Sequence, residues 1–363
     1  MIRGWCPTAW RPMAADDGLL VRVRPQLGRL TREQVLGLCE AATTYGNGQI
    51  DATNRANLQI RGVDAWEPLV ARLCDLGLVD PDPIAEARRA ILVTPHWRLG
   101  DDTYRIATEL ADRLSELPEL PGKVGFAIDA GGAPVLCEHP ADFRIERCSD
   151  GDLMLRADGR DQGARVAVGG EVDALIALAH WFVDTGGATA GRMARHTAAL
   201  PMIAAVRSQP TAAKPEHPVG VPHGLPFGRI DAPALAAFME ASGATAIRVT
   251  PWRTLLVEGG TPGVALAGDA DPATVRVDAC VGAPACPHAS VATRDLALRL
   301  AHKVTGRLHV SGCAKGCARS AAADVVLTGN GGRFDLGFAA RAGDPPFLAG
   351  LDAPAVLAHF GAT

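Results

Sequence analysis

The stretch GRLTREQVLGLCEAATTYGNGQIDATNRANLQIRG, residues 28–62, holds the order of elements that decides the fold. Apolar residues recur at helical spacing up to Glu40-Ala41, and two short strand-like segments follow at 50–53 and 58–62. This pattern predicts one helix and then two strands, which together make a small α+β unit.

A second copy of this unit begins 200 residues later. Gly228-Arg229-Ile230 opens a helical pattern that runs to Glu240-Ala241, and strand-like segments follow at 247–250 and 255–259 after a three-residue deletion. Because the matched blocks keep their order, we predict a tandem duplication. Chance similarity among segments rich in alanine, leucine and glycine is the alternative.

A larger unit follows each small one. The helical pattern at 106–114 precedes Gly122-Lys123-Val124, and its counterpart at 296–304 precedes Gly306-Arg307-Leu308, so that Arg307 is matched with Lys123. A pseudo-twofold pair of this kind is expected to place an active site between the halves.

A linker is predicted between the two copies. Six prolines fall between residues 201 and 226, and proline neither donates to a strand ladder nor continues a helix. The expected segments are 1–70 and 80–200 for the small and larger units of the first half, 201–226 for the linker, and 227–265 and 270–363 for the second half.

The composition indicates a chain that can bury a sizeable core, with 48% hydrophobic and 21% charged residues. The net charge of −4 argues against a general nucleic-acid binder. No apolar run reaches the roughly 18 residues of a membrane helix, and the opening residues contain no apolar signal segment. Nine cysteines, unevenly placed, argue against a disulfide framework. We therefore expect a soluble cytoplasmic protein with no membrane partner.

Four of the nine cysteines lie close together in the sequence, with the spacings Cys280-x5-Cys286 and Cys313-x3-Cys317. Structural zinc sites use tighter pairs, whereas four thiolates are the ligand set of a [4Fe–4S] cluster. Small residues around these cysteines allow backbone N–H groups to approach the sulfurs. Four buried core cysteines are the alternative; we predict a cluster.

With these residues the chain resembles the nitrite/sulfite reductase superfamily, in which such cysteine pairs bind a [4Fe–4S] cluster that can bridge to a sirohaem iron. Residues 312–319 and 331–336 resemble the cluster signature and its glycine-rich sequel, and residues 46–62 resemble the ferredoxin-like half-domain motif. The resemblance implies an α+β, nitrite/sulfite reductase-like fold. Two ferredoxin-like half-domains would each be followed by a larger α+β domain, the second of which binds the cluster.

Within this superfamily, Gly4-Trp5-Cys6-Pro7 and residues 17–25 and 53–59 are most similar to the precorrin-3B synthases of cobalamin biosynthesis. This similarity implies a monooxygenase that hydroxylates a meso carbon of precorrin-3A and closes a lactone from a ring acetate. Its partners would be this tetrapyrrole substrate, dioxygen and an external electron donor. A sirohaem-dependent sulfite or nitrite reductase is the first alternative, and a [4Fe–4S] electron-transfer protein is an alternative of another class.

The superfamily reductases surround their tetrapyrrole and its anionic ligand with two arginines and two lysines. Arg55, Arg89 and Lys123 match three of these residues, and the second lysine falls on Gly125. This departure weakens the reductase alternative, because bound sulfite or nitrite needs dense positive charge and proton donors. Guanidinium forks suit the carboxylates of a tetrapyrrole. The predicted substrate-binding residues are Arg55, Arg89, Lys123, Arg61 and Arg307.

Oxygen insertion needs a redox metal or an activated substrate, which leaves room for a mononuclear iron beside the cluster. The histidines do not show the spacing of a two-histidine, one-carboxylate site, so no second metal is assigned. His288 is of interest because it lies two residues after Cys286. Sirohaem is expected only on the reductase alternative.

Overall fold

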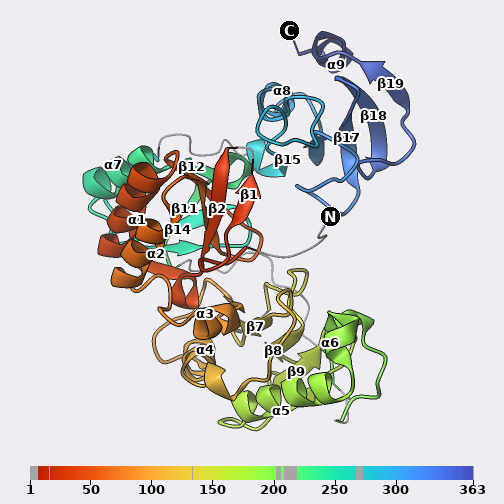
Figure 1. Cartoon of the computed structure of the whole chain (residues 1–363). Coiled ribbons are helices and arrows are strands. Elements are labelled where there is room, and N and C mark those ends of the chain that lie inside the picture. Colours follow the sequence, from red (N-terminus) through yellow and green to blue (C-terminus); the bar gives the residue numbers. More distant parts are fainter. Residues whose placement is uncertain are drawn as a thin grey trace.

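The computed structural model describes residues 7–15, 17–132, 134–201, 206–207, 219–266 and 273–362. Figure 1 shows a central unit, in which red and orange strands of the first half lie beside teal strands of the second. A yellow-to-green unit lies at one end of it and a blue unit at the other.

Two sheets form the central unit, and each contains a strand from the other half of the chain. The first has the order β1 (Met13–Ala15), β2 (Gly18–Val23), β5 (Leu58–Val63), β4 (Gln49–Ala52) and β12 (Arg229–Asp231). The second has the order β11 (Val221–Gly224), β14 (Thr254–Glu258), β13 (Ala246–Val249) and β3 (Arg29–Thr31). Since β12 pairs with β4 and β3 pairs with β13, the two halves exchange edge strands.

Among the described residues, the central unit has three helices, two of which begin directly after the exchanged strands. They are α1 (Arg32–Tyr45), α2 (Trp66–Asp75) and α7 (Ala232–Ser242). The Thr31 hydroxyl accepts the Gln34 N–H at the start of α1, and the Asp231 carboxylate accepts the Ala234 N–H at the start of α7. These side chains satisfy N–H groups that a helix leaves unpaired at its first turn. The helices α1 and α7 contact each other and cover one shared core.

The two halves have the same backbone conformation at matching positions. Leu27 and Phe227 both have left-handed φ angles, 51° and 57°, at an offset of 200 residues. Ala56 and Arg253 do so again, at 52° and 58°, but at an offset of 197. Such conformations are uncommon outside glycine. Their recurrence confirms the predicted duplication and its three-residue deletion.

Each half continues into an outer unit of the same topology. The first outer sheet has the order β6 (Ile91–Val93), β7 (Phe126–Asp129), β8 (Phe143–Arg147), β9 (Leu153–Ala157) and β10 (Ala164–Arg165). The second has the order β15 (Val277–Ala279), β16 (Leu308–Ser311), β17 (Ala323–Asn330), β18 (Arg333–Ala340) and β19 (Leu348–Leu351). In both sheets, the first three strands pair with one another in parallel. The fourth strand pairs antiparallel with the third, and the fifth pairs antiparallel with the fourth. The remaining helices are α3 (Pro83–Arg88), α4 (Asp102–Asp112), α5 (Glu171–Asp184), α6 (Gly187–Ala190), α8 (Arg294–Leu300) and α9 (Ala353–His359).

The strand registers correct one predicted correspondence. They place Phe126 and Leu308 at equivalent positions of β7 and β16. Arg307 is therefore the counterpart of Gly125, and its predicted match with Lys123 is wrong. The glycine that opens each Gly-x-apolar pattern lies at a different distance before its strand, so the similarity of the two patterns was misleading.

Part of the predicted linker, residues 202–205 and 208–218, lies outside the described residues. Its last residues include β11, which pairs with β14 and so begins the second half of the central unit before residue 227. Of the helices in the described ranges, none is both long and apolar enough to cross a membrane.

Candidate functional site

Two equivalent turns, each anchored by a threonine, present side chains at the centre of the molecule. Between β4 and β5, the Thr53 hydroxyl accepts the backbone N–H of Arg55 at 3.3 Å and of Asn57 at 3.2 Å. Between β13 and β14, the Thr250 hydroxyl accepts the backbone N–H of Trp252 at 3.2 Å. Local bonds of this kind fix a turn without a helix or strand ladder. The first turn thus presents Arg55, and its counterpart presents Trp252.

The structure brings Arg55 and Lys123 together. Both terminal guanidinium nitrogens of Arg55 donate to the backbone oxygen of Lys123 at 3.3 Å, and Lys123 itself is exposed. Arg55 and Gly125 also line one small cavity together with Arg22 and Arg24. Three arginines therefore line the cavity at the position where the second lysine was expected. Substrate binding by Arg55 and Lys123 stays a prediction.

The backbone at Gly125 suits glycine. A Cβ atom at this position would lie 3.0 Å from the carbonyl oxygen of Ala90, closer than ordinary contact. The Gly125 N–H also donates to the buried Asp142 carboxylate at 3.1 Å, which holds the segment in place. A lysine here would require its neighbours to move, so the departure from the reductase pattern is built into the local packing.

Arg89 lies beside an acidic partner. Its guanidinium donates to the buried Glu86 carboxylate at 2.9 Å and to the Arg24 carbonyl oxygen at 3.1 Å. Glu86 also pairs with Arg24 at 3.3 Å. One buried carboxylate thus binds both arginines, which packs α3 against the central unit. The substrate contact of Arg89 stays a prediction. Such a contact requires that the Arg89 guanidinium remain accessible beside Glu86.

Arg61 belongs to a network of charges on the first central sheet. It pairs with Asp17 at 2.8 Å and with Asp51 at 3.4 Å, and Arg229 of the exchanged strand pairs with Asp51 at 2.9 Å. The guanidinium of Arg61 is buried. Its fork already faces two carboxylates, so the geometry describes a residue that holds the exchanged strand.

The equivalent positions of the second central sheet carry the same kind of network with two charges reversed. Arg248 stands where the first sheet has Asp51, and Glu258 stands where it has Arg61. Arg29 of the exchanged strand pairs with Glu258 at 2.8 Å. An ion pair therefore holds each exchanged strand. In both pairs the exchanged strand supplies the arginine, but the acidic partner lies at a different position in each half.

Arg307 lies on the second outer unit, around the carboxylate of Asp278. This carboxylate pairs with Arg307 at 3.0 Å and with Arg253 at 2.9 Å, and Arg319 lies 3.7 Å from it. Arg253 also donates to the carbonyl oxygen of Ala318, the residue after Cys317. Asp278 therefore connects the β13–β14 turn to the cysteine loop, and the substrate contact predicted for Arg307 stays a prediction.

The four cysteines of the predicted cluster lie in the loops that follow β15 and β16. Burial raises the pKa of Cys317, Lys315 lowers it, and the thiols of Cys313, Cys280 and Cys286 each raise it further. The charge state of the Cys317 thiol is therefore coupled to the other three thiols of the set. In the described ranges, no group of three or more His, Cys, Asp or Glu side chains stands at metal-binding distances.

The backbone around these thiols suits a cluster. The Gly312 N–H donates to the Cys280 sulfur at 3.1 Å, as amides do at iron–sulfur centres. A Cβ at Gly312 would lie 2.5 Å from that of Ala289, and one at Gly282 would lie 2.7 Å from the Thr293 hydroxyl. A Cβ at either position would collide with these side-chain atoms, so glycine suits the close packing here. Four soft sulfur donors in two neighbouring loops, with one backbone N–H already bonded to a sulfur, are the chemistry that a [4Fe–4S] cluster requires.

Trp252 meets two histidines of the first outer unit. Its ring stacks on His96 with centroids 5.9 Å apart, and the His139 ring lies edge-on at 6.0 Å. The spacing of His96 and His139 in the sequence does not indicate this group, and Trp252 was not among the predicted site residues. The duplication could have identified the tryptophan, because it occupies the position equivalent to Arg55.

Asp129, at the end of β7, positions the loop that carries His139. One of its carboxylate oxygens accepts the backbone N–H of Val135 at 2.6 Å and of Leu136 at 2.7 Å. Burial raises the pKa of this carboxyl to about 6, although the two N–H groups act in the opposite direction.

A pH dependence of stability follows from Asp129. Between its ordinary pKa of 3.8 and about 6, the folded protein binds the proton more tightly than the unfolded chain does. Its contribution to stability is therefore full below pH 4 and falls as the pH rises to 6, by roughly 2–3 kcal/mol at about 1.4 kcal/mol per pKa unit. Replacing Asp129 with asparagine should remove this loss. Denaturant unfolding of both proteins at pH 4 and pH 7 checks this prediction. If the free energies of unfolding of variant and wild type differ by the same amount at both pH values, the assignment is contradicted.

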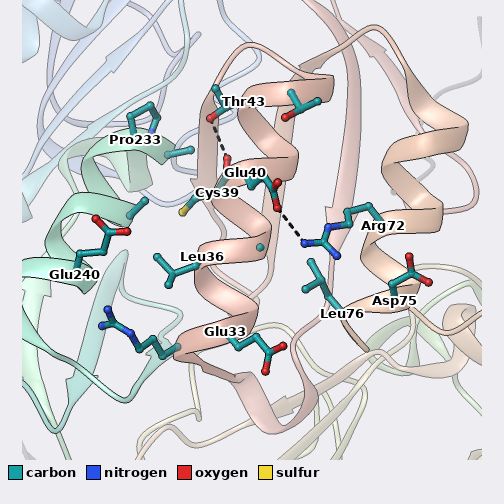
Figure 2. A pocket seen from close by; sticks show the side chains of 15 residues that line it. Glu33, Leu36, Cys39, Glu40, Thr43, Arg72, Asp75, Leu76, Pro233 and Glu240 are labelled. Atoms are coloured by element: carbon teal, nitrogen blue, oxygen red, sulfur yellow. Dashed lines mark hydrogen bonds and ion pairs between the residues drawn. The ribbon is translucent and has the colours of Figure 1, made fainter.

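Two further hollows are lined by other residues. His288 lines a cleft of about 560 Å³ together with Ala314, the neighbour of Cys313. A groove of about 870 Å³ runs between α1, α2 and α7, and Figure 2 shows its Glu40–Arg72 ion pair. The described residues that line this groove include none of the predicted site residues.

Comparisons with known proteins agree with this geometry. The family model "Nitrite/Sulfite reductase ferredoxin-like half domain" matches residues 11–73. The solved structure of the Mycobacterium tuberculosis NirA protein superposes with a TM-score of 0.58 at 18% identity, covering 90% of this chain and 76% of that one. The protein therefore has the α+β fold of the nitrite and sulfite reductases. A curated relative, the precorrin-3B synthase of Sinorhizobium sp., is 30% identical over 397 aligned positions, which cover 91% of this chain and 81% of the relative. The chain belongs to the precorrin-3B synthase family.

Proposed function

We propose that this chain is the oxygen-dependent monooxygenase that converts precorrin-3A to precorrin-3B in cobalamin biosynthesis. One atom of dioxygen enters a meso carbon of the macrocycle, and a ring acetate closes a lactone. The other atom leaves as water, with two electrons and two protons from an external donor. The observation that carries this proposal is the 30% identity to a precorrin-3B synthase over 91% of the chain.

The arrangement of Arg55 and Lys123 supports a polycarboxylate substrate. Both terminal nitrogens of Arg55 donate to the Lys123 carbonyl oxygen, which fixes the orientation of the guanidinium. The Lys123 ammonium is exposed beside it. A flexible macrocycle with acetate and propionate arms needs such fixed cations to hold one meso carbon in place.

The second outer unit supports an electron-transfer role close to the same site. Bound by Cys280, Cys286, Cys313 and Cys317, a [4Fe–4S] cluster would supply single electrons. Through Asp278, Arg253 ties the cluster loop to the turn that carries Trp252. We assign no ligands to a mononuclear iron. We place the protein in the cytoplasm, where thiols are kept reduced and available to bind a cluster.

The test uses full-length protein purified without air. We expect about four irons and four sulfides per chain, with a broad charge-transfer shoulder and no sharp tetrapyrrole bands. Precorrin-3A, ¹⁸O₂ and a ferredoxin-type reductant should then give a product that contains one ¹⁸O atom, measured by mass spectrometry. Tightly bound sirohaem together with sulfite or nitrite reduction would overturn the proposal in favour of the reductase alternative.

A further inference from the structure

Trp252 is a large apolar side chain left exposed where the parts of the molecule meet. It lies on the turn between β13 and β14, and 38% of its surface is exposed. Burying the rest of this ring against another flat ring system would be favourable.

Two histidines support the tryptophan from one side. His96 follows β6 and stacks on the indole with an interplanar angle of 24°, and His139 follows β7 and meets it edge-on at 72°. Burial lowers the pKa of both imidazoles, and nearby Arg248 and Arg144 lower them further. Both rings are therefore neutral near pH 7 and extend an uncharged aromatic surface.

The surroundings place this surface next to the proposed carboxylate site. The His139 ring hydrogen-bonds the backbone of Asn54, the residue before Arg55. The residue after Trp252, Arg253, donates to the carbonyl oxygen of Ala318 in the cysteine loop. Contacts therefore connect the Trp252 turn both to the turn that carries Arg55 and to the loop that carries the cysteines.

We propose that Trp252, supported by His96 and His139, is a stacking platform for one face of the tetrapyrrole macrocycle. The two equivalent turns would then contact different parts of the substrate. Arg55 of the first turn would pair with the carboxylate arms, and Trp252 of the second would contact the ring system. This inference rests on the proposed function and adds a positioning residue to it.

Binding of uroporphyrin III to the full chain tests the platform. This probe is an air-stable tetrapyrrole with eight carboxylates, and its Soret band reports binding. We expect Trp252→Leu to weaken binding about tenfold and Trp252→Phe to stay within about threefold of wild type, because an aromatic face is retained. Trp181→Leu is the matched control: Trp181 also contacts a histidine, His196, but it lies on α5. This control should bind as wild type does.

A second measurement needs no variant. Bound uroporphyrin III should protect Trp252 of the wild-type protein from oxidation by N-bromosuccinimide, read by peptide mass spectrometry, and leave Trp181 unprotected. Wild-type binding combined with an unchanged affinity of Trp252→Leu, or with no protection of Trp252, overturns the platform and leaves the proposed function standing. A wild-type protein that binds no uroporphyrin III at all counts against the proposed function itself and removes the basis of the platform.

Discussion

Arg55→Ala is expected to lower kcat/KM for precorrin-3A by about 10- to 100-fold. A charge-assisted hydrogen bond to a carboxylate contributes roughly 1.5–3 kcal/mol, and about 1.4 kcal/mol corresponds to one factor of ten. The side chain is partly exposed and its backbone is fixed by Thr53, so its removal should leave the fold intact. Steady-state kinetics checks this, with circular dichroism to confirm folding.

Two further variants separate charge from geometry. Arg55→Lys keeps the charge but loses the planar fork, so it should fall between wild type and alanine. Arg72→Ala is the matched control, since Arg72 forms an exposed ion pair with Glu40 on the groove side of α1 (Figure 2). Exposed pairs contribute little, so this control should keep full activity. Equal kcat/KM for wild type and Arg55→Ala would contradict the assignment of Arg55.

Cys313→Ser is expected to reduce bound iron from about four per chain to nearly none and to abolish turnover. The cluster needs four thiolates, and a serine hydroxyl is a harder and far weaker ligand for iron. Iron and acid-labile sulfide assays on anaerobic protein, together with the visible absorption spectrum, measure this loss. Cys286→Ser should behave in the same way, because each cysteine of the set is required.

The control for the cysteine variants is Cys74→Ser. Cys74 is a partly buried thiol on α2, in the central unit. This variant should keep its iron and its spectrum. Retention of a full complement of iron by Cys313→Ser would show that the quartet is not the ligand set and would return these cysteines to the role of core residues.

The sequence was sufficient to predict features that repeat or that carry a spacing. The duplication was visible because left-handed positions such as Gly28 and Gly228 restrict which residues can follow a turn. The spacing of the four cysteines was visible in the sequence, and the structure places the two pairs in loops at the ends of neighbouring parallel strands, β15 and β16; their role as a ligand set stays a prediction. These features depend on local chemistry, which a single sequence displays.

The features that were not predicted depend on pairing between distant segments. Nothing local to Arg61 indicates that Asp17 and Asp51 engage its guanidinium, and nothing local to Arg89 indicates the buried Glu86. The exchange of β3 and β12 joins residues that are some two hundred positions apart. The predicted match of Arg307 was wrong because Gly306-Arg307-Leu308 resembles Gly122-Lys123-Val124. The first of these patterns leads directly into β16, whereas the second ends before β7 begins.

The exchange of edge strands has a consequence for the order in which the molecule can be built. Leu30 finds its partner, Ile247, only after more than two thirds of the chain has been made. Similarly, Ile50 waits for Ile230 before the edge of the first sheet is covered. A nascent first half therefore leaves the ribosome with an open sheet edge, the kind of surface that pairs with the wrong chain. Splitting the gene at the proline-rich segment should give fragments that are insoluble alone and soluble when made together.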